Sequence, residues 1–359
     1  MNRPLELGRK DRWAVILAGG EGTRLRSYIH RITGRECPKQ YYPVVGTTTL
    51  LEQTLARVWL RLAPERTLVV VNRAHQGFYS AISKIWPELE LLIQPTNHGT
   101  APGILYALMV IATRSPNASV AIFPSDHYVG DSDRFMQYVD SAFDATLRHP
   151  ETPILLGVAP FEAELGYGWI EPGTLISNGA EPPVLRISGF WEKPPLHIAR
   201  ELFHHACLLN TFIIVGTVSS LIGTIASALP STYAAMNVAQ SALDHALEEV
   251  MIRAIYSRMA HADFSQSVLA ERPDKFAVMS ISDVEWSDLG VPERVIALQS
   301  RGINGTDSRA SLLANDAANE GERVTRASSA KSPDARIRPR REIDFELSVP
   351  PQGGSQIIV

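Results

Sequence analysis

A short apolar run leads directly into a glycine-rich, arginine-bearing loop in the stretch Trp13-Ala-Val-Ile-Leu-Ala-Gly-Gly-Glu-Gly-Thr-Arg-Leu-Arg26. The apolar run predicts a buried strand that delivers the loop to one edge of a sheet. Gly19, Gly20 and Gly22 leave backbone N–H groups free to turn towards a bound anion without obstruction by a Cβ atom. The loop is therefore predicted to cradle phosphate groups, with the Arg24 guanidinium placed to hold a polyphosphate.

Two common phosphate-binding loops do not fit this stretch. The dinucleotide-binding pattern needs a third glycine where Leu25 stands, and the P-loop needs a Gly-Lys-Ser/Thr sequence that is absent. A plain tight turn is the alternative interpretation, and the later segments decide against it.

The composition is typical of a globular enzyme. Of 359 residues, 45% are hydrophobic and 20% are charged, and the formal net charge is −4. This balance gives no general attraction to nucleic acid or to an anionic membrane, so we expect neither as a partner. No apolar run approaches the ~18 residues of a membrane span, and Met1 to Arg12 has no signal-peptide core. We therefore expect a cytoplasmic protein. Cys37 and Cys207 are expected to be buried or half-buried thiols.

Apolar, β-branched runs alternate with amphipathic helical stretches over the first 160 residues. This alternation predicts an α/β fold with a mixed, mostly parallel sheet and helices on both faces. Helices are expected over Leu50 to Leu62 and Ala101 to Thr113. The first should pack Leu51, Leu55, Val58 and Leu62 on the sheet. The predicted strands are Trp13–Leu17, Thr67–Val71, Leu89–Ile93, Ser119–Phe123 and Thr152–Val158.

The pattern changes after Val158. Three segments broken by proline and glycine are predicted to form shorter, more antiparallel strands, which wall one side of a cleft instead of extending the parallel core. A helical block from about Val218 to Met259 and a strand over Phe276 to Ser282 should follow. The three cleft-wall segments are Gly166–Pro172, Val184–Trp191 and Leu208–Val215.

The two ends of the chain differ from its middle. We expect one domain over residues 13–302, preceded by an N-terminal extension, 1–12. Residues 303–359 are rich in Ser, Ala, Asn, Asp, Arg and Gly, and Phe345 is their only aromatic residue. Such a segment cannot bury enough apolar surface to order itself, so a disordered tail is predicted.

Two aspartates follow apolar strands of the predicted sheet. Asp126 ends the run Ala121 to Asp126, and Asp288 lies in Val284-Glu-Trp-Ser-Asp-Leu-Gly290. Because the carboxyl ends of strands form the ligand crevice of an open α/β sheet, both are candidate Mg²⁺ ligands. Glu285 could serve as the metal ligand in place of Asp288. Asp126 could instead cap the turn or the helix that follows it. His127 is interpreted as a satisfied structural imidazole, since no second His or Cys lies at ligand spacing.

Three cationic residues lie in rigid segments at the predicted ligand edge. Arg24 belongs to the glycine loop, Lys39 follows Pro38, and Lys193 precedes Pro194. Either lysine alone would be interpreted as a solvated surface residue. Together the three suit a reaction between two anionic substrates.

Eight segments carry a family resemblance: Leu17–Leu25, Pro38–Gln40, Gln94–Pro102, Phe123–His127, Gly166–Glu171, Phe190–Pro194, Asn210–Thr211 and Trp286–Gly290. They occur in the order seen in sugar-phosphate nucleotidyltransferases, and the chain most resembles the mannose-1-phosphate guanylyltransferases over about residues 13 to 300. Two departures stand out. His98 replaces the usual Arg, and Leu209 with Phe212 replaces the usual Trp and Gly around Asn210.

The resemblance implies a Rossmann-like nucleotidyltransferase fold, with a nucleotide-binding half over about 13–160 and a sugar-binding half over about 161–290. It implies catalytic roles for Arg24, Lys39, Asp126 and Lys193, and Mg²⁺ on Asp126 and Asp288. The sugar phosphate would contact Gly168, Glu171, Lys193 and Asn210. The nucleotide would contact Leu17, Gly19, Gly20, Gly22, Thr23, Arg24, Lys39, Gln94, Gly99, Thr100 and Ala101.

The implied reaction joins GTP and mannose 1-phosphate into GDP-mannose and pyrophosphate, and homodimer formation is left open. Another hexose 1-phosphate or another NTP is an alternative. A metal-dependent glycosyltransferase is a second alternative, because Asp131-Ser-Asp133 imitates its Asp-x-Asp motif, although that class needs no glycine-rich arginine loop. A non-catalytic sugar-nucleotide sensor is the third. Retention of both aspartates and all three cations argues against it.

Overall fold

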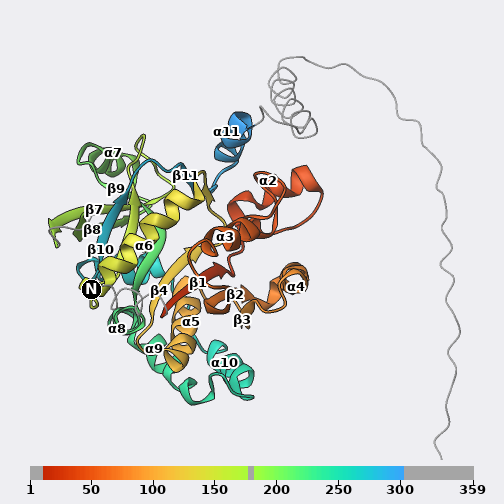
Figure 1. Ribbon diagram of the computed structural model, residues 1–359. Helices are drawn as coiled ribbons and strands as arrows, with labels where there is room; N and C mark the ends of the chain where they lie inside the picture. The colour runs from red at the N-terminus through yellow and green to blue at the C-terminus, as the bar shows by residue number, and fades with distance from the viewer. Residues whose placement is uncertain (1–10, 177–181, 303–359) are drawn as a thin grey trace, which may run out of the picture. The chain divides into compact units, whose positions relative to one another are not determined.

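The computed structural model describes residues 11–176 and 182–302 (Figure 1). The predicted tail, 303–359, and most of the predicted N-terminal extension, 1–12, lie outside the described residues. The strands within the described ranges are β1 Arg12–Ala18, β2 Thr67–Asn72, β3 Glu90–Gln94, β4 Ser119–Pro124, β5 Tyr128–Val129, β6 Ile154–Val158, β7 Gly168–Leu175, β8 Val184–Glu192, β9 Leu208–Thr217, β10 Ala277–Ile281 and β11 Trp286–Ser287.

One sheet organises the described residues, and it contains nine of these strands in the order β3-β2-β1-β4-β9-β6-β10-β8-β7. Within the block β3, β2, β1 and β4, each strand is parallel to the next. Strand β1 shows the burial on both faces that is typical of parallel strands. Val15 packs in one hydrophobic core, while Ala14 and Ile16 pack in another, so the strand is buried on both faces. The predicted α/β fold with a mixed sheet is confirmed. This first block is parallel as predicted, whereas every pairing of β7, β8 and β9 is antiparallel.

Helices cover both faces of the sheet, as predicted. Helices α5 and α8 contribute to the core that contains Val15, and α3 and α6 contribute to the core that contains Ile16. Figure 1 labels the helices, which are α2 Thr23–Thr33, α3 Leu50–Val58, α4 Gln76–Ile85, α5 Thr100–Arg114, α6 Ser132–Arg148, α7 Leu196–His204, α8 Val218–Ala228, α9 Pro230–Asn237, α10 Glu248–Tyr256 and α11 Pro292–Gly302.

Helix α3 begins where predicted but ends at Val58, four residues before the predicted end. The side chains expected to face the sheet, including Leu62 beyond the helix end, are all buried in the core with Ile16. Thr49 forms a capping box with Glu52 at the helix start.

Strand β9 corrects the prediction for the second half. We expected the strands after Val158 to stay outside the parallel core, but β7, β8 and β9 all join the nine-stranded sheet of the described residues. Strand β9 lies antiparallel between β4 and β6. It can occupy this central place because Ile213 and Val215 pack in one core and Ile214 in the other. The local pattern of prolines and glycines does not reveal which strands will be neighbours.

The chain direction of β9 matters for the site. Because β9 is antiparallel to β4, its first residues lie at the edge of the sheet where β1 and β4 end. Strand β1 is also the point where the order reverses, with β2 on one side and β4 on the other. A crevice outside such a reversal is the usual ligand site of an open α/β sheet.

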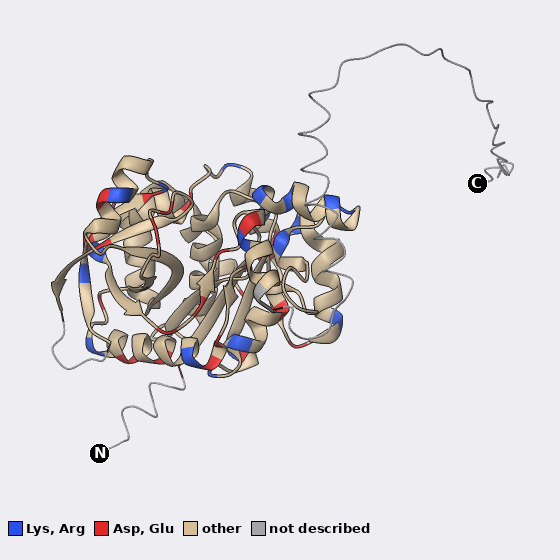
Figure 2. Cartoon of the chain, turned by 90° about the horizontal axis from the view of Figure 1, so that it is seen from above, with Lys and Arg blue, Asp and Glu red and all other residues tan. Residues whose placement is uncertain are grey.

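Figure 2 shows Lys and Arg interspersed with Asp and Glu over the described elements. Among the helices of the described ranges, none is long and apolar enough to cross a membrane.

Candidate active site

A cavity of about 240 Å³ lies at the carboxyl ends of β1 and β4. Two further cavities, of about 170 and 200 Å³, share lining residues with it. The predicted site residues in the first are Leu17, Gly20, Arg24, Thr100, Asp126, Gly168, Lys193, Asn210 and Asp288. The second adds Gly19, Gln94 and Gly99, and the third adds Gly22, Thr23 and Lys39.

Two predicted site residues line none of these three cavities. Ala101 is fully buried, and its N–H donates to the carbonyl of Ala262 over 3.1 Å. Glu171 lies on β7, where its carboxylate covers Gly189 of the neighbouring strand β8. Glu285, the alternative to Asp288, also lies outside the cavity linings, and its carbonyl accepts a hydrogen bond from Gly130.

The glycine loop is held by the segment that carries Lys39. Gly22 has a left-handed backbone, with φ of 59°, and a Cβ there would lie 2.9 Å from the backbone nitrogen of Lys39. Next to Lys39, the Gln40 side-chain amide donates to the carbonyls of Ala18 and Gly20 at 2.9 and 2.8 Å. Sequence reasoning gave Gln40 no role, although it lies inside one of the recognised segments.

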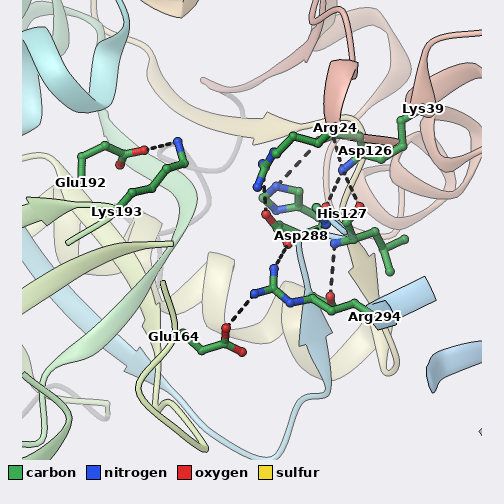
Figure 3. Close-up of polar contacts among 12 residues, drawn as sticks. Arg24, Lys39, Asp126, His127, Glu164, Glu192, Lys193, Asp288 and Arg294 are labelled. Atoms are coloured by element: carbon green, nitrogen blue, oxygen red, sulfur yellow. Dashed lines mark hydrogen bonds and ion pairs between the residues drawn. The ribbon is translucent and has the colours of Figure 1, made fainter. Parts of the chain in front are cut away.

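Lys39 joins the two predicted metal-binding aspartates (Figure 3). Its Nζ lies 3.0 Å from Asp126 Oδ2 and donates to the backbone carbonyl of Asp288. The lysine side chain is only 6% exposed, so these contacts hold an ammonium group away from bulk water. The loop after β4 and the loop after β11 are thereby joined through one cation.

The Asp288 carboxylate is contacted by two arginines. Arg24 Nη2 lies 3.4 Å from Oδ2, and Arg294 Nη1 donates to Oδ1 at 2.7 Å. Oδ1 also accepts from the N–H of Gly290 at 2.8 Å. Figure 3 shows Arg24 and Arg294 approaching the carboxylate from different elements, α2 and α11.

Arg294 is a functional candidate that sequence reasoning missed. Its second donor, Nη2, lies 2.7 Å from Glu164, and its guanidinium lies 4.1 Å from the ring centre of Tyr167. It therefore connects Asp288 to the loop that precedes β7. Its place in the first turn of a helix, four residues after Gly290, was the available signal.

The charges around the two aspartates favour their ionised forms. Burial alone would raise the pKa of Asp126, but the Lys39 ammonium lowers it below its usual value. Burial likewise opposes ionisation of Asp288, and the cationic neighbours, Lys39 and Arg294 among them, bring its pKa below the usual value.

His127 lies beside Asp126 and corrects one expectation. Burial lowers its pKa to about 4, so the imidazole is neutral at pH 7. We predicted an imidazole whose ring nitrogens both have partners. Among the described residues, however, its Nδ1 has no hydrogen-bond partner. Its ring contacts Trp286 edge-on, with ring centres 5.4 Å apart.

Lys193 lies apart from the other two predicted cations. It follows the last residue of β8 in a left-handed conformation, φ 49°, and its Nζ lies 2.6 Å from Glu192 Oε1. Figure 3 shows this pair on the other side of the view from Lys39 and Asp126. Arg24 and Lys39 therefore form one cationic group and Lys193 a second, both bordering the cavity system.

Asn210 and Gly168 complete the wall near Lys193. The Asn210 side chain accepts from the N–H of Phe212 at 2.9 Å, which fixes its orientation at the start of β9. A Cβ on Gly168 would lie 2.7 Å from the Phe190 ring and 2.9 Å from Glu192, so the glycine permits close packing here.

Comparison with known proteins bears on this geometry. The family model described as "Nucleotidyl transferase" matches residues 13–301. The mannose-1-phosphate guanylyltransferase RfbM of Salmonella typhimurium is 26% identical over 77% of this chain and 56% of its own length. A mannose-1-phosphate guanylyltransferase of Sinorhizobium fredii is 27% identical over 84% of this chain and 57% of its own length. The chain thus spans less than two thirds of these curated relatives.

A crystal structure described as mannose-1-phosphate geranyltransferase from Thermus thermophilus has a TM-score of 0.67. It is 25% identical, and the match covers 80% of this chain and 79% of that one. The family match runs from strand β1, which leads into the glycine loop, to helix α11, which carries Arg294, and so includes every site residue described above. The chain belongs to the nucleotidyl transferase family.

Proposed function

We propose that this chain transfers a nucleotidyl group from GTP to mannose 1-phosphate, giving GDP-mannose and pyrophosphate. One observation carries the proposal. A glycine loop with Arg24, and a buried Lys39, converge on two aspartates at the carboxyl edge of β1 and β4. The names of the guanylyltransferase relatives support the choice of substrates.

The proposed chemistry needs charge neutralisation more than a general base. A phosphate monoester has a second pKa of about 6, so the attacking oxygen of a sugar 1-phosphate is already mostly ionised at pH 7. The difficulty is repulsion between two polyanions. Arg24 and Lys39 would stabilise the triphosphate as charge moves to the leaving pyrophosphate, and Lys193 would hold the sugar phosphate.

Asp126 and Asp288 suit a Mg²⁺ ion, which in such sites uses one or two carboxylates and completes its shell with water and substrate phosphate. Both aspartates contact Lys39 and favour the ionised form. No group of three or more His, Cys, Asp or Glu side chains in the described part of the chain could hold a metal by itself. The ion would add positive charge at the phosphates.

Pyrophosphate release tests the proposal. A matrix of four NTPs against several sugar 1-phosphates should give the highest rate for GTP with mannose 1-phosphate, and no release without a sugar phosphate. A glycosyltransferase would release no pyrophosphate, and a sensor would bind nucleotide sugar without turnover. Faster pyrophosphate release with a different NTP and sugar 1-phosphate would change the proposed substrates but not the proposed type of reaction.

A further inference from the structure

The segment His261 to Phe264 is fixed against the loop that leads into α5. The Ala262 N–H donates to the His98 carbonyl at 2.9 Å, and the Ala262 carbonyl accepts from Ala101 at 3.1 Å. The Phe264 N–H donates to Thr100 Oγ1 at 2.8 Å. Asp263 lies between these two anchored residues, so its backbone position is set from both sides.

Gly99 makes this close approach possible. Its φ is 87°, and a Cβ there would lie 2.4 Å from the Ala262 carbonyl oxygen. Only a residue without a side chain fits, which means that Gly99 and Asp263 are placed relative to each other by the backbone.

Asp263 lines the cavity of about 170 Å³ beside the glycine loop, together with Gln94, Asn97 and Gly103. The carboxylate is half-buried and makes no hydrogen bond or ion pair with another described residue. Gln94 is different. Its Oε1 accepts from the buried Tyr256 hydroxyl at 3.2 Å, which leaves its Nε2 as the free donor. The cavity thus offers an acceptor-only group and an oriented amide donor.

We infer that Asp263 selects the nucleobase by accepting hydrogen bonds from the N1–H and the 2-amino group of guanine. This inference rests on the proposed function, because it assigns the cavity beside the glycine loop to the base of the nucleotide. An ionised carboxylate has two acceptor oxygens and no donor. Guanine presents two adjacent donors at N1 and N2, and a carboxylate pairs with both.

The other bases do not match this acceptor. Adenine presents an unprotonated N1, and cytosine an unprotonated N3, next to a single amino group, so a lone pair would face the carboxylate. Uracil and thymine present one N–H between two carbonyl oxygens. A site built on hydrogen bonds discriminates strongly against a base that leaves its buried groups unpaired.

Asp263→Asn tests the inference because it replaces one acceptor oxygen with a donor. Xanthine carries a carbonyl at C2 where guanine carries the amine, so it becomes the matching base. We expect the kcat/KM for GTP to fall by about 10- to 100-fold, the range for a hydrogen bond to a charged group. The kcat/KM for XTP should rise above that of GTP. Asp274→Asn, which alters an exposed aspartate paired with Arg272, is the control.

Binding measurements separate the inference from the proposed function. Calorimetric titration with GDP and XDP reports base selection without turnover, and thermal melting checks that the variant folds. A folded Asp263→Asn variant that keeps the wild-type preference for GTP over XTP and for GDP over XDP would overturn the role of Asp263. The proposed reaction would still stand in that case if the wild-type protein turns over GTP. A wild-type protein that binds GDP no better than ADP would overturn the inference. Absence of pyrophosphate release from every NTP would overturn the proposed function instead.

Discussion

Arg24 and Arg26 lie two residues apart in α2 but have different surroundings. Arg24 approaches Asp288 at the cavity, whereas Arg26 pairs with Glu21 and Glu36. We expect Arg24→Ala to lower kcat by ~10²-fold or more, because a preorganised charge would be lost where negative charge develops. Steady-state kinetics check this, with Arg26→Ala as a matched control. A change confined to the KM for the nucleotide would argue for ground-state binding only.

Lys193 should affect the other substrate. Because it lies at the end of β8 with Glu192, away from Lys39, Lys193→Ala is expected to raise the KM for the sugar phosphate far more than the KM for GTP. The same kinetic series measures both constants. The reverse pattern would assign Lys193 to the nucleotide.

Arg294 should act through Asp288, since its Nη1 holds Oδ1 of that carboxylate at 2.7 Å. Arg294→Gln is expected to raise the Mg²⁺ concentration that gives half-maximal rate by about 10- to 100-fold, the usual effect of losing a group that orients a metal ligand. Arg272→Gln removes a half-buried arginine paired with the exposed Asp274 and serves as the control. An unchanged Mg²⁺ dependence in a folded Arg294 variant would contradict this positioning role.

The sequence predicted Arg24 because it lies in the glycine-rich loop at the end of a strand, and Lys39 because Pro38 restricts the backbone beside it. It could not predict Arg294, because a helical arginine is usually solvated and its contacts with Glu164 and Asp288 are set by tertiary packing. Its distance of 130 residues from Glu164 leaves no local pattern to detect.

The glycine loop is the element whose geometry can be tested most directly. Gly22 needs a left-handed backbone and closely approaches Lys39, whereas a Cβ on Gly20 would meet no atom within 4 Å. We expect Gly22→Ala to reduce the free energy of unfolding by about 1 to 2 kcal/mol from backbone strain alone, and to lower kcat by displacing Lys39. Gly20→Ala should change stability far less. Chemical denaturation of both variants checks this, and equal losses would contradict the role assigned to Gly22.

Strand positions were predictable only where local pattern decides them. The runs that became β1, β2 and β4 are buried on both faces and pair in parallel, so their apolar sequences identified them. The place of β9 between β4 and β6 depends on pairing between strands distant in the chain. This pairing also explains why Asn210, from the second half, lies at the same cavity as Asp126.

At the scale of the whole molecule, the two halves predicted from the sequence share one sheet in the described residues. Strand β9 supplies the hydrogen-bonding partner of both β4 and β6, and both hydrophobic cores contain residues from before and after residue 160. The predicted boundary near 160 therefore divides neither the sheet nor the two cores, and residues from both sides of it line the same cavity.

Two truncations test the shared sheet and the predicted C-terminal tail separately. A fragment ending at Pro160 would leave β4 and β6 without their common neighbour, exposing strand edges and much of both cores, so we expect it not to fold. A chain ending at Asn304 keeps every described strand, helix and site residue, and should retain its melting temperature and its rate of pyrophosphate release. Circular dichroism and steady-state kinetics compare the two with the full chain. Independent folding of the shorter fragment would contradict the shared core, and a large fall in melting temperature or rate on truncation at Asn304 would assign residues 305–359 a structural role.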